Sequence, residues 1–416
     1  MPEIRDFRNR GKRICMDNPP AATPERMYEL DWLRVIVTIN LIPFHVAWMI
    51  TSVSGFSFVE RGTVAWNILH GYVRFVSPLH MFLLFLVAGT STFMALRYRS
   101  PRQYIAERIK RLLIPLFTFM IFLFPALGYF WPTAIDLSRI NYLTQFWPWC
   151  LKTTFYSEIT GGPNWAHMWF VAYLLIYSVI LLPLFLLIRA GKSPVIESWT
   201  RFLTNRRGAI FLMGIPLSLT FAILSPIWPF FRNNLYSDWG YFAYNMVAFY
   251  FGYIISHDPR WTRSFDRHAA ASLVLGIAFS AAKLLMEFFS PSFSTPAYNT
   301  SYALYSLVAG LNTWFWVVAV LSIARKSLSF TNGFLRYSNR ISYPFYIFHL
   351  VVISVAGHYI TPMRRGIIAE FVIICVVSFA ISVLCCELVK STRVTRFLFG
   401  IKEKLLIRSR SATSRL

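Results

Sequence analysis

Residues 33–52 read LRVIVTINLIPFHVAWMITS. The hydrocarbon core of a bilayer is crossed by about 20 mostly apolar residues in one helix, and this stretch has that length. It is too long for the apolar part of a cleaved signal peptide, and no small-residue cleavage site is evident. We therefore expect a retained membrane-spanning helix here, preceded by a basic, disordered cytoplasmic segment over residues 1–28.

The whole chain has the composition of a membrane protein. Of its 416 residues, 56% are hydrophobic and 14% are charged, whereas soluble domains carry about 25% charged residues. Further apolar runs of the required length follow the first one, so the sequence predicts an all-α bundle of about ten transmembrane helices. The expected spans are 33–52, 77–96, 112–131, 166–188, 208–229, 239–256, 269–289, 303–324, 341–360 and 366–388.

The basic residues are distributed as the lipid bilayer requires. The chain carries 41 Lys and Arg against 18 Asp and Glu. With both termini in the cytoplasm, 32 of these cations fall in predicted cytoplasmic segments and 7 in predicted outer loops, and cytoplasmic loops favour cations. The charge therefore needs no nucleic-acid partner. We expect one transmembrane domain, 29–390, and a basic cytoplasmic tail, 391–416.

The first span carries polar side chains along one face. At the angular spacing of an α-helix, Asp31, Arg34, Thr38 and His45 fall within a stripe of about 60°. Arg34 and His45 lie about 16 Å apart along the axis, so the stripe resembles a channel wall with a cation at the cytoplasmic mouth and a titratable base deeper inside. In the alternative interpretation, Arg34 reaches the headgroups and His45 makes a packing hydrogen bond.

Two arginines lie where the third span begins. Arg108 and Arg111 are three residues apart, which places them on one face of a helix. The general excess of cytoplasmic cations explains arginines in this loop but not their pairing. Two guanidinium groups on one face suit a phosphate.

The ninth span has a second polar stripe. Ser338, Ser342, Tyr346 and His349 fall within about 80° of one another. They are candidates to line a substrate cavity, and hydrogen bonding between helices explains them equally well.

Other polar groups carry weaker signals. His80 and His167 are expected at the outer ends of the second and fourth spans, where a histidine is often simply hydrated. Lys283 and Glu287 lie four residues apart, which indicates a structural ion pair. The five cysteines match neither a metal-binding nor a disulfide pattern.

Together these residues resemble the membrane-bound acyltransferase-3 family. Its first-span motif, a cation followed by His after ten residues, matches Arg34 and His45, and the Asp that usually precedes the cation matches Asp31. Its RxxR pattern matches Arg108 to Arg111. The aromatic start of the fourth span matches His167-Met168-Trp169-Phe170, and the Ser, Tyr and closing His of the ninth span match residues 342–349.

The resemblance implies transfer of an acyl group from cytoplasmic acyl-CoA to a hydroxyl of an extracytoplasmic glycan, in a bacterial inner membrane. The catalytic residues are then His45 as the base, Arg34, and Asp31, which orients Arg34, and a covalent acyl-histidine stays an alternative. Arg34, Arg108 and Arg111 are expected to bind the phosphates of acyl-CoA. The residues expected to line the acceptor side are His167, Trp169, Ser342, Tyr346 and His349.

Within the family, the sequence is most similar to the glucans biosynthesis protein C group, which succinylates periplasmic glucans. The segment Ile42-Pro43-Phe44-His45 is similar to its first-span motif, and 359–362 and 397–400 are similar to its C-terminal region. One departure is that Ala88 precedes Gly89 where the family often has Ser, so a donor contact from that hydroxyl is missing.

Two other functions stay open at this level. A secondary transporter or flippase would also have about ten spans with buried charge, although matched broken helices in two halves are not evident. An enzyme of the same family could transfer acetyl to a surface polysaccharide. No metal or nucleotide motif is present, so succinyl-CoA or acetyl-CoA as donor is the only small molecule implied.

Overall fold

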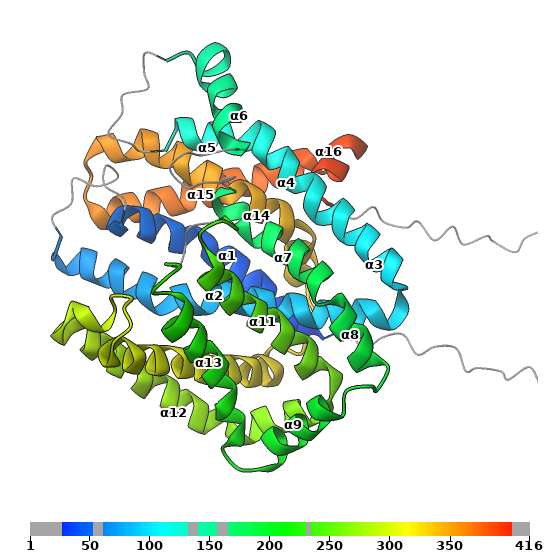
Figure 1. Cartoon of the computed structure of the whole chain (residues 1–416). Helices are drawn as coiled ribbons and strands as arrows, with labels where there is room; N and C mark the ends of the chain where they lie inside the picture. Colours follow the sequence, from blue (N-terminus) through cyan, green and yellow to red (C-terminus); the bar gives the residue numbers. More distant parts are fainter. Residues whose placement is uncertain (1–26, 53–60, 132–139, 156–164, 230–233, 402–416) are drawn as a thin grey trace, which may run out of the picture.

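A computed structural model describes residues 27–52, 61–131, 140–155, 165–229 and 234–401 (Figure 1). Every element in these ranges is a helix or a helical turn, so the all-α fold is confirmed for them. Residues 1–26 of the predicted basic N-terminal segment, and residues 402–416 of the predicted tail, lie outside the described residues.

Long helices form most of the molecule. Several begin at polar caps whose side chains accept a hydrogen bond from the first turn, such as Thr63 before α2 and Asn332 before α14. The long helices are α1 (Tyr28–Ser52), α2 (Val64–Tyr98), α11 (Trp239–His257), α12 (Pro259–Phe289), α13 (Thr300–Ser327), α14 (Gly333–Ile360) and α15 (Ile367–Val389).

The third span is continuous but irregular. It comprises α3 (Pro101–Arg108), η1 (Ile109–Leu113), α4 (Ile114–Thr118), η2 (Phe119–Leu123) and α5 (Phe124–Tyr129). The π-helical turns η1 and η2 each end just before Pro115 or Pro125. Proline donates no backbone hydrogen bond and its ring crowds the preceding turn, so a wider turn accommodates it.

Prolines also break two other apolar segments. The helix α7 (Trp169–Ile180) follows the turn η4 (Ala166–Met168) and is bent by 50° from α8 (Leu182–Arg189), which has Pro183 in its first turn. Residues Ala209–Leu224 divide into η5 (Ala209–Gly214), α10 (Ile215–Leu219) and η6 (Thr220–Leu224). The shorter elements are η3 (Tyr142–Phe146), α6 (Trp147–Phe155), α9 (Pro194–Asn205), η7 (Pro291–Phe293), η8 (Thr361–Met363) and α16 (Arg393–Leu398).

The predicted number of spans is not confirmed. Seven helices in the described residues are long and apolar enough to cross a membrane, and eight if the bent pair α7–α8 is one span. The ten predicted spans all fall on helical segments, but Ala209–Leu224 is short and α11 is not among the seven. Several Tyr residues, an Asn and a His lower the hydropathy of α11.

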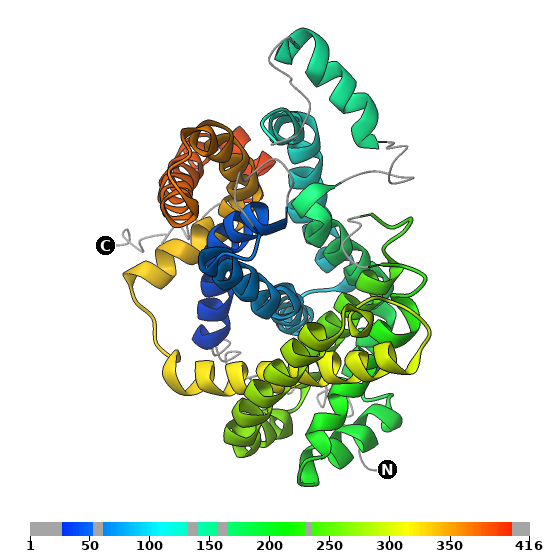
Figure 2. The ribbon, with the colours of Figure 1, turned by 90° about the vertical axis from the view of Figure 1, so that its left-hand side faces the viewer.

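The helix α1 lies inside the bundle and packs against α2 and α14 (Figure 2). Around it, α2 packs on α11, α14 on α15 and α12 on α13. The α2–α11 contact is very close, since a Cβ added to Gly252 would lie 1.9 Å from the carbonyl oxygen of Leu86. Small residues allow helix backbones to approach in this way inside a membrane.

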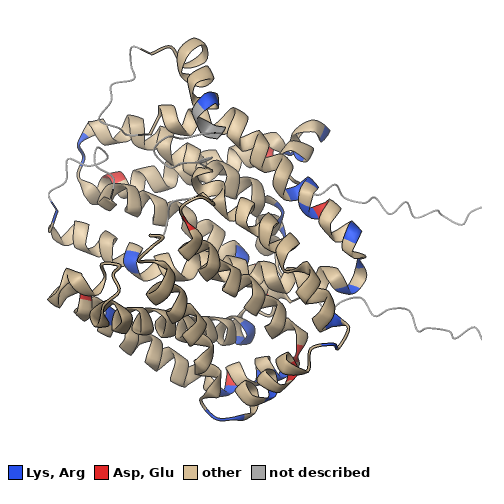
Figure 3. Cartoon of the chain, viewed as in Figure 1, with Lys and Arg blue, Asp and Glu red and all other residues tan. Residues whose placement is uncertain are grey.

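The charged side chains gather at the ends of the helices. Figure 3 shows Lys and Arg concentrated on the side where α3 begins and α8 ends, and around α9. The apolar middle of the bundle carries few charges, which is the pattern of a protein that spans a membrane.

Candidate functional site

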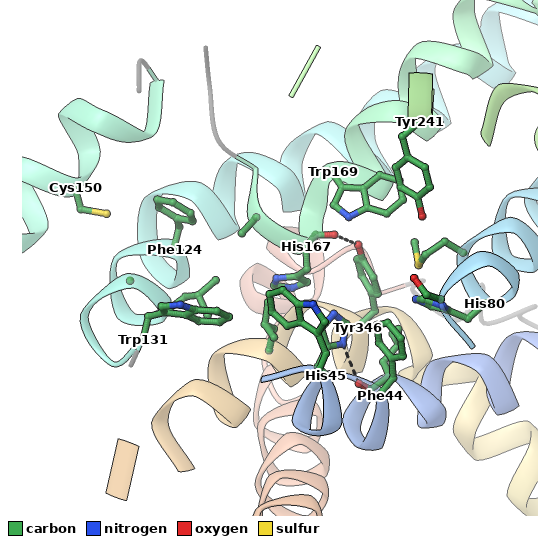
Figure 4. A pocket seen from close by; sticks show the side chains of 18 of the residues that line it. Phe44, His45, His80, Phe124, Trp131, Cys150, His167, Trp169, Tyr241 and Tyr346 are labelled. Carbon is green, nitrogen blue, oxygen red and sulfur yellow. Dashed lines mark hydrogen bonds between the residues drawn. The ribbon is translucent and has the colours of Figure 1, made fainter. Parts of the chain in front are cut away.

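A cavity of about 1040 Å³ lies among α1, α2, α5, α6, α7, α11 and α14 (Figure 4). Its walls are mainly aromatic, with a few polar side chains between the rings. Ligand sites commonly combine an apolar, aromatic wall with a small number of polar groups that fix orientation. Its lining includes the rings of Trp48, Trp131, Trp149, Trp169, Phe146 and Tyr241.

His45 projects from α1 into this cavity. Its Nδ1 lies 2.9 Å from the carbonyl oxygen of Leu41. A carbonyl oxygen only accepts hydrogen bonds, so in the neutral ring Nδ1 carries the proton and Nε2 carries a lone pair. The site therefore presents one imidazole nitrogen that can accept a proton from a molecule in the cavity.

Two further histidines, His167 of η4 and His349 of α14, lie beside His45. The ring centroid of His349 is 5.0 Å from that of His45 and 4.9 Å from that of His167. His167 lines the cavity, whereas His349 is fully buried and is not part of the lining. Residues more than 300 positions apart in the chain are thus brought into one cluster of imidazoles.

His80 also lines the cavity, next to the ring of Phe44. The helix α2 begins at Val64, so His80 lies well inside the helix and not at its first turn. Its Nδ1 lies 3.0 Å from the carbonyl oxygen of Val76. Like His45, it therefore presents Nε2 as an acceptor.

The ninth-span stripe is divided by the structure. Tyr346 lines the cavity and donates a hydrogen bond to the carbonyl oxygen of His167, which joins α14 to η4 (Figure 4). Ser342 is buried outside the cavity lining, and its hydroxyl donates to the carbonyl oxygen of Asn339 at 3.2 Å. Ser338, one turn earlier, is also buried and outside the lining. Of the four residues of the stripe, only Tyr346 lines the cavity.

Arg34 lies at the junction of three helices. Its guanidinium group donates to Asp31 Oδ1 at 3.1 Å, to Ser91 Oγ of α2 at 3.1 Å and to Asn339 Oδ1 of α14 at 3.3 Å. The contact with Asp31 expected from their spacing is therefore present. Neither Arg34 nor Asp31 lines the cavity.

Arg108 also turns towards α2. Its Nη2 donates to Thr92 Oγ1 at 2.8 Å, and its guanidinium carbon lies 5.0 Å from the centre of the Tyr104 ring. The π-helical turn η1 begins at Ile109, so the step from Arg108 to Arg111 does not follow the spacing of a regular α-helix. Both arginines lie outside the cavity lining.

Among the described residues, the cavity at His45 does not continue to Arg34 as the expected channel would. Between these two levels, α1 contributes the buried residues Thr38 and Leu41, and α14 contributes the buried residue Phe345. The cavity reaches His45 from the side of Trp131 and Trp149 and does not extend to Arg34. Close packing of these helices separates the arginines from the imidazoles.

The sequence interpretation missed part of the wall. Gln145, Trp149 and Cys150 line the cavity from η3 and α6, in the stretch predicted as the longest outer loop. The short helix α6 lies in this stretch. The signal available was the four aromatic residues close together in this stretch, Tyr142, Phe146, Trp147 and Trp149. Residues 132–139 and 156–164 of the same loop lie outside the described residues.

The expected ion pair in α12 belongs to a larger group. Lys283 Nζ lies 4.0 Å from Glu287 Oε1, and the same oxygen lies 2.6 Å from Arg74 Nη2 of α2. Tyr305 of α13 donates to it at 2.7 Å.

The described residues contain no group of His, Cys, Asp or Glu arranged to hold a metal ion.

These features define a helical membrane protein with an aromatic cavity and an unbonded imidazole nitrogen on its wall. A family model described as an acyltransferase domain (acyltransferase 3) matches residues 27–387. The chain therefore belongs to the acyltransferase-3 family, as its motifs indicate. Searches among curated proteins and among solved structures found no match.

Proposed function

We propose that the protein is a membrane O-acyltransferase that moves an acyl group from cytoplasmic acyl-CoA to a hydroxyl of an extracytoplasmic glycan. The single observation that supports this most is His45, whose Nε2 lone pair faces an aromatic cavity of about 1040 Å³. Membership of the acyltransferase-3 family supports the reaction class. Succinyl transfer to a periplasmic glucan is the specific reaction we favour, because of the similarity of the motifs around His45.

In this reaction, His45 Nε2 accepts the proton of the acceptor hydroxyl while the oxygen attacks the thioester carbonyl. The new C–O bond forms, the C–S bond breaks, and the proton passes from His45 to the leaving sulfur, which departs as the free thiol of coenzyme A. A positioned general base of this kind contributes about 10²–10⁴ in rate. Transfer in this way requires no acyl-enzyme.

The acceptor suits the side of the cavity that bears the tryptophans. A sugar has flat apolar faces and polar edges, so rings such as Trp131, Trp149 and Trp169 can pack against its faces. Gln145 and Tyr241, also in the lining, offer hydrogen bonds to its hydroxyls. We place this side outside the cytoplasm, in a bacterial inner membrane with both chain termini in the cytoplasm.

The donor would bind at the opposite, basic side. Arg108, Arg111 and Arg34 are the cations we propose for the phosphates of acyl-CoA, with Asp31 holding Arg34 in place. The packed residues between Arg34 and His45 then have to separate to let the thioester reach the base. We therefore propose that binding of acyl-CoA is coupled to separation of the residues between Arg34 and His45.

The base is tested by replacing His45 with Ala and measuring acyl substituents on exported glycans by mass spectrometry. We expect a fall of at least about 100-fold at equal membrane levels. The matched control is His358→Ala, because His358 is an exposed histidine of α14 outside the cavity lining. Unchanged glycan acylation in His45→Ala cells would remove His45 from the reaction. The mass of the transferred group separates succinyl from acetyl.

The donor site is tested by the double variant Arg108→Ala with Arg111→Ala. Since charge-assisted hydrogen bonds to phosphate are strong, we expect the Kd for acyl-CoA to rise at least about tenfold. Arg201→Ala, on α9, combined with Arg206→Ala, at the residue after α9, removes the same net charge away from the proposed site. An equal loss of affinity in both double variants would mean that only general charge attracts the donor.

A further inference from the structure

Two imidazole nitrogens near His45 have no hydrogen-bond partner. They are Nε2 of His349 and Nδ1 of His167, and both atoms are buried. Most buried polar side-chain atoms in folded proteins have a partner, so each exception calls for an explanation. Here two exceptions belong to neighbouring rings, 4.9 Å apart between centroids.

The other nitrogen of each ring fixes where the protons are. His349 Nδ1 lies 2.6 Å from the carbonyl oxygen of Tyr346, and His167 Nε2 lies 3.1 Å from that of Ile347. Because carbonyl oxygens only accept, these nitrogens carry the protons of the neutral rings. The unpartnered nitrogens are therefore lone pairs. His45 Nε2 is a third one, so the rings cannot bond to one another while all of them are neutral.

One added proton changes this. Once His45 Nε2 is protonated it becomes a donor, and the ring of His349 is 5.0 Å away between centroids. This separation allows an N–H···N bond of about 2.9 Å once the rings turn so that the two Nε2 atoms face each other. The proton would thus supply the partner that His349 Nε2 lacks.

The composition of the cavity wall determines how important His349 Nε2 is as a hydrogen-bond acceptor for His45. Besides His45, the polar side chains that line the cavity are Ser77 and His80 of α2, Gln145 of η3, Cys150 of α6, His167 of η4, Tyr241 of α11 and Tyr346 of α14. No Asp, Glu, Lys or Arg is among the cavity-lining residues that the structure describes. A protonated His45 therefore has no carboxylate beside it in this wall, and uncharged acceptors are what remains to stabilise the charge.

We propose that His349 is a positioning residue that accepts a hydrogen bond from protonated His45 and so stabilises the imidazolium formed during acyl transfer. This rests on the proposed function. The proton comes from the acceptor hydroxyl and leaves with the coenzyme A sulfur, so His349 itself gains and loses nothing.

The test in the transfer assay compares two substitutions at one position. His349→Phe keeps a ring of similar size without an acceptor, and we expect kcat to fall about 10- to 100-fold with the KM for acyl-CoA unchanged. His349→Gln places an amide oxygen near the former Nε2, and we expect kcat within about fivefold of wild type. His358→Phe, on the same helix, is the control. Wild-type kcat in His349→Phe, or equal losses in both variants, would overturn the proposal.

A second measurement does not depend on acyl transfer. In ¹⁵N-histidine-labelled protein reconstituted in vesicles and acidified until His45 is protonated, we expect a ¹⁵N–¹⁵N coupling across the bond between the two rings. The coupling should vanish in His349→Phe and in His45→Ala. Its absence from the wild type would refute the contact even if transfer is observed. Its presence in a protein without transfer activity would leave the contact standing and reject the proposed function.

Discussion

The carboxylate of Glu287 lies between two cations contributed by two helices. Arg74 and Lys283 both lie within ion-pair distance of its Oε1, and Tyr305 donates to the same oxygen. The Glu287 side chain is 9% exposed. We expect Glu287→Gln to lower the free energy of unfolding by about 2–3 kcal/mol, because the substitution leaves two cations without a counter-charge.

The chain contains a matched control for this prediction. Glu387 also accepts from a tyrosine, Tyr337, and pairs with a lysine, Lys390, but its side chain is 45% exposed. Because exposed ion pairs contribute little, Glu387→Gln should change stability by less than about 1 kcal/mol. Chemical unfolding of both variants in the same detergent gives the comparison. Similar losses of unfolding free energy in the two variants would show that the burial of Glu287 does not strengthen its ion pairs.

For single residues, the sequence predicts contacts within one helix but not contacts between residues of different helices. The four-residue spacing identified Lys283 and Glu287 as a pair, and the three-residue spacing identified Asp31 and Arg34. Arg74 comes to Glu287 from another helix, and no local pattern announces such a contact. For the same reason His45 and His349 were assigned to separate stripes, and their contact emerged only from the packing of α1 on α14.

Between elements, the contact of α2 with α11 depends on two glycines. A Cβ at Gly252 would lie 1.9 Å from the carbonyl oxygen of Leu86, and one at Gly89 would lie 2.0 Å from that of Phe249. Since backbone atoms cannot move aside easily, we expect Gly252→Ala to destabilise the protein by about 1–3 kcal/mol. A lower thermal unfolding temperature in detergent measures this effect.

The comparison for that variant is Gly71→Ala. Gly71 lies in the same helix α2, and a Cβ added there meets nothing within 4 Å. Alanine is preferred over glycine in a helix by up to about 1 kcal/mol, so this change should leave stability unchanged or raise it slightly. If Gly252→Ala behaved in the same way, the close helix crossing would be excluded.

Helix boundaries show the limit of hydropathy as a guide to elements. The predicted second span begins at residue 77, whereas α2 begins at Val64, because Thr63 caps the helix and a helix can continue beyond the apolar run. The third span was predicted as a regular helix from residue 112. Its π-helical turns depend on Pro115 and Pro125 and on how the neighbouring helices pack, which a count of apolar residues does not include.

For the whole molecule, the number of crossings must agree with the placement of the termini. If both ends of the chain are cytoplasmic, the number is even, so eight or ten crossings are allowed and seven are not. The eight-crossing arrangement takes the bent pair α7–α8 as one span and leaves out Ala209–Leu224 and α11. The two arrangements differ only in whether the connection between these segments reaches the outer side.

The cavity indicates which arrangement holds. Tyr241 of α11 lines it, with its ring centroid 5.0 Å from that of Trp169, and Tyr173 donates a hydrogen bond to Asp238 just before α11. The start of α11 therefore lies on the same side as the tryptophan-rich opening. If that opening accepts a glycan from outside the cytoplasm, residues 234–238 have to lie outside as well, which requires ten crossings.

A cysteine at Tyr236 decides between these arrangements, because its side chain is 72% exposed. In a chain whose native cysteines are replaced by Ala, we expect Tyr236→Cys to react with a membrane-impermeant maleimide in intact spheroplasts. Lys192→Cys, in a predicted cytoplasmic segment, should react only after the membrane is opened. Protection of Tyr236→Cys in intact spheroplasts would put the start of α11 on the cytoplasmic side, and the glycan would then have no route to His45 through the aromatic opening.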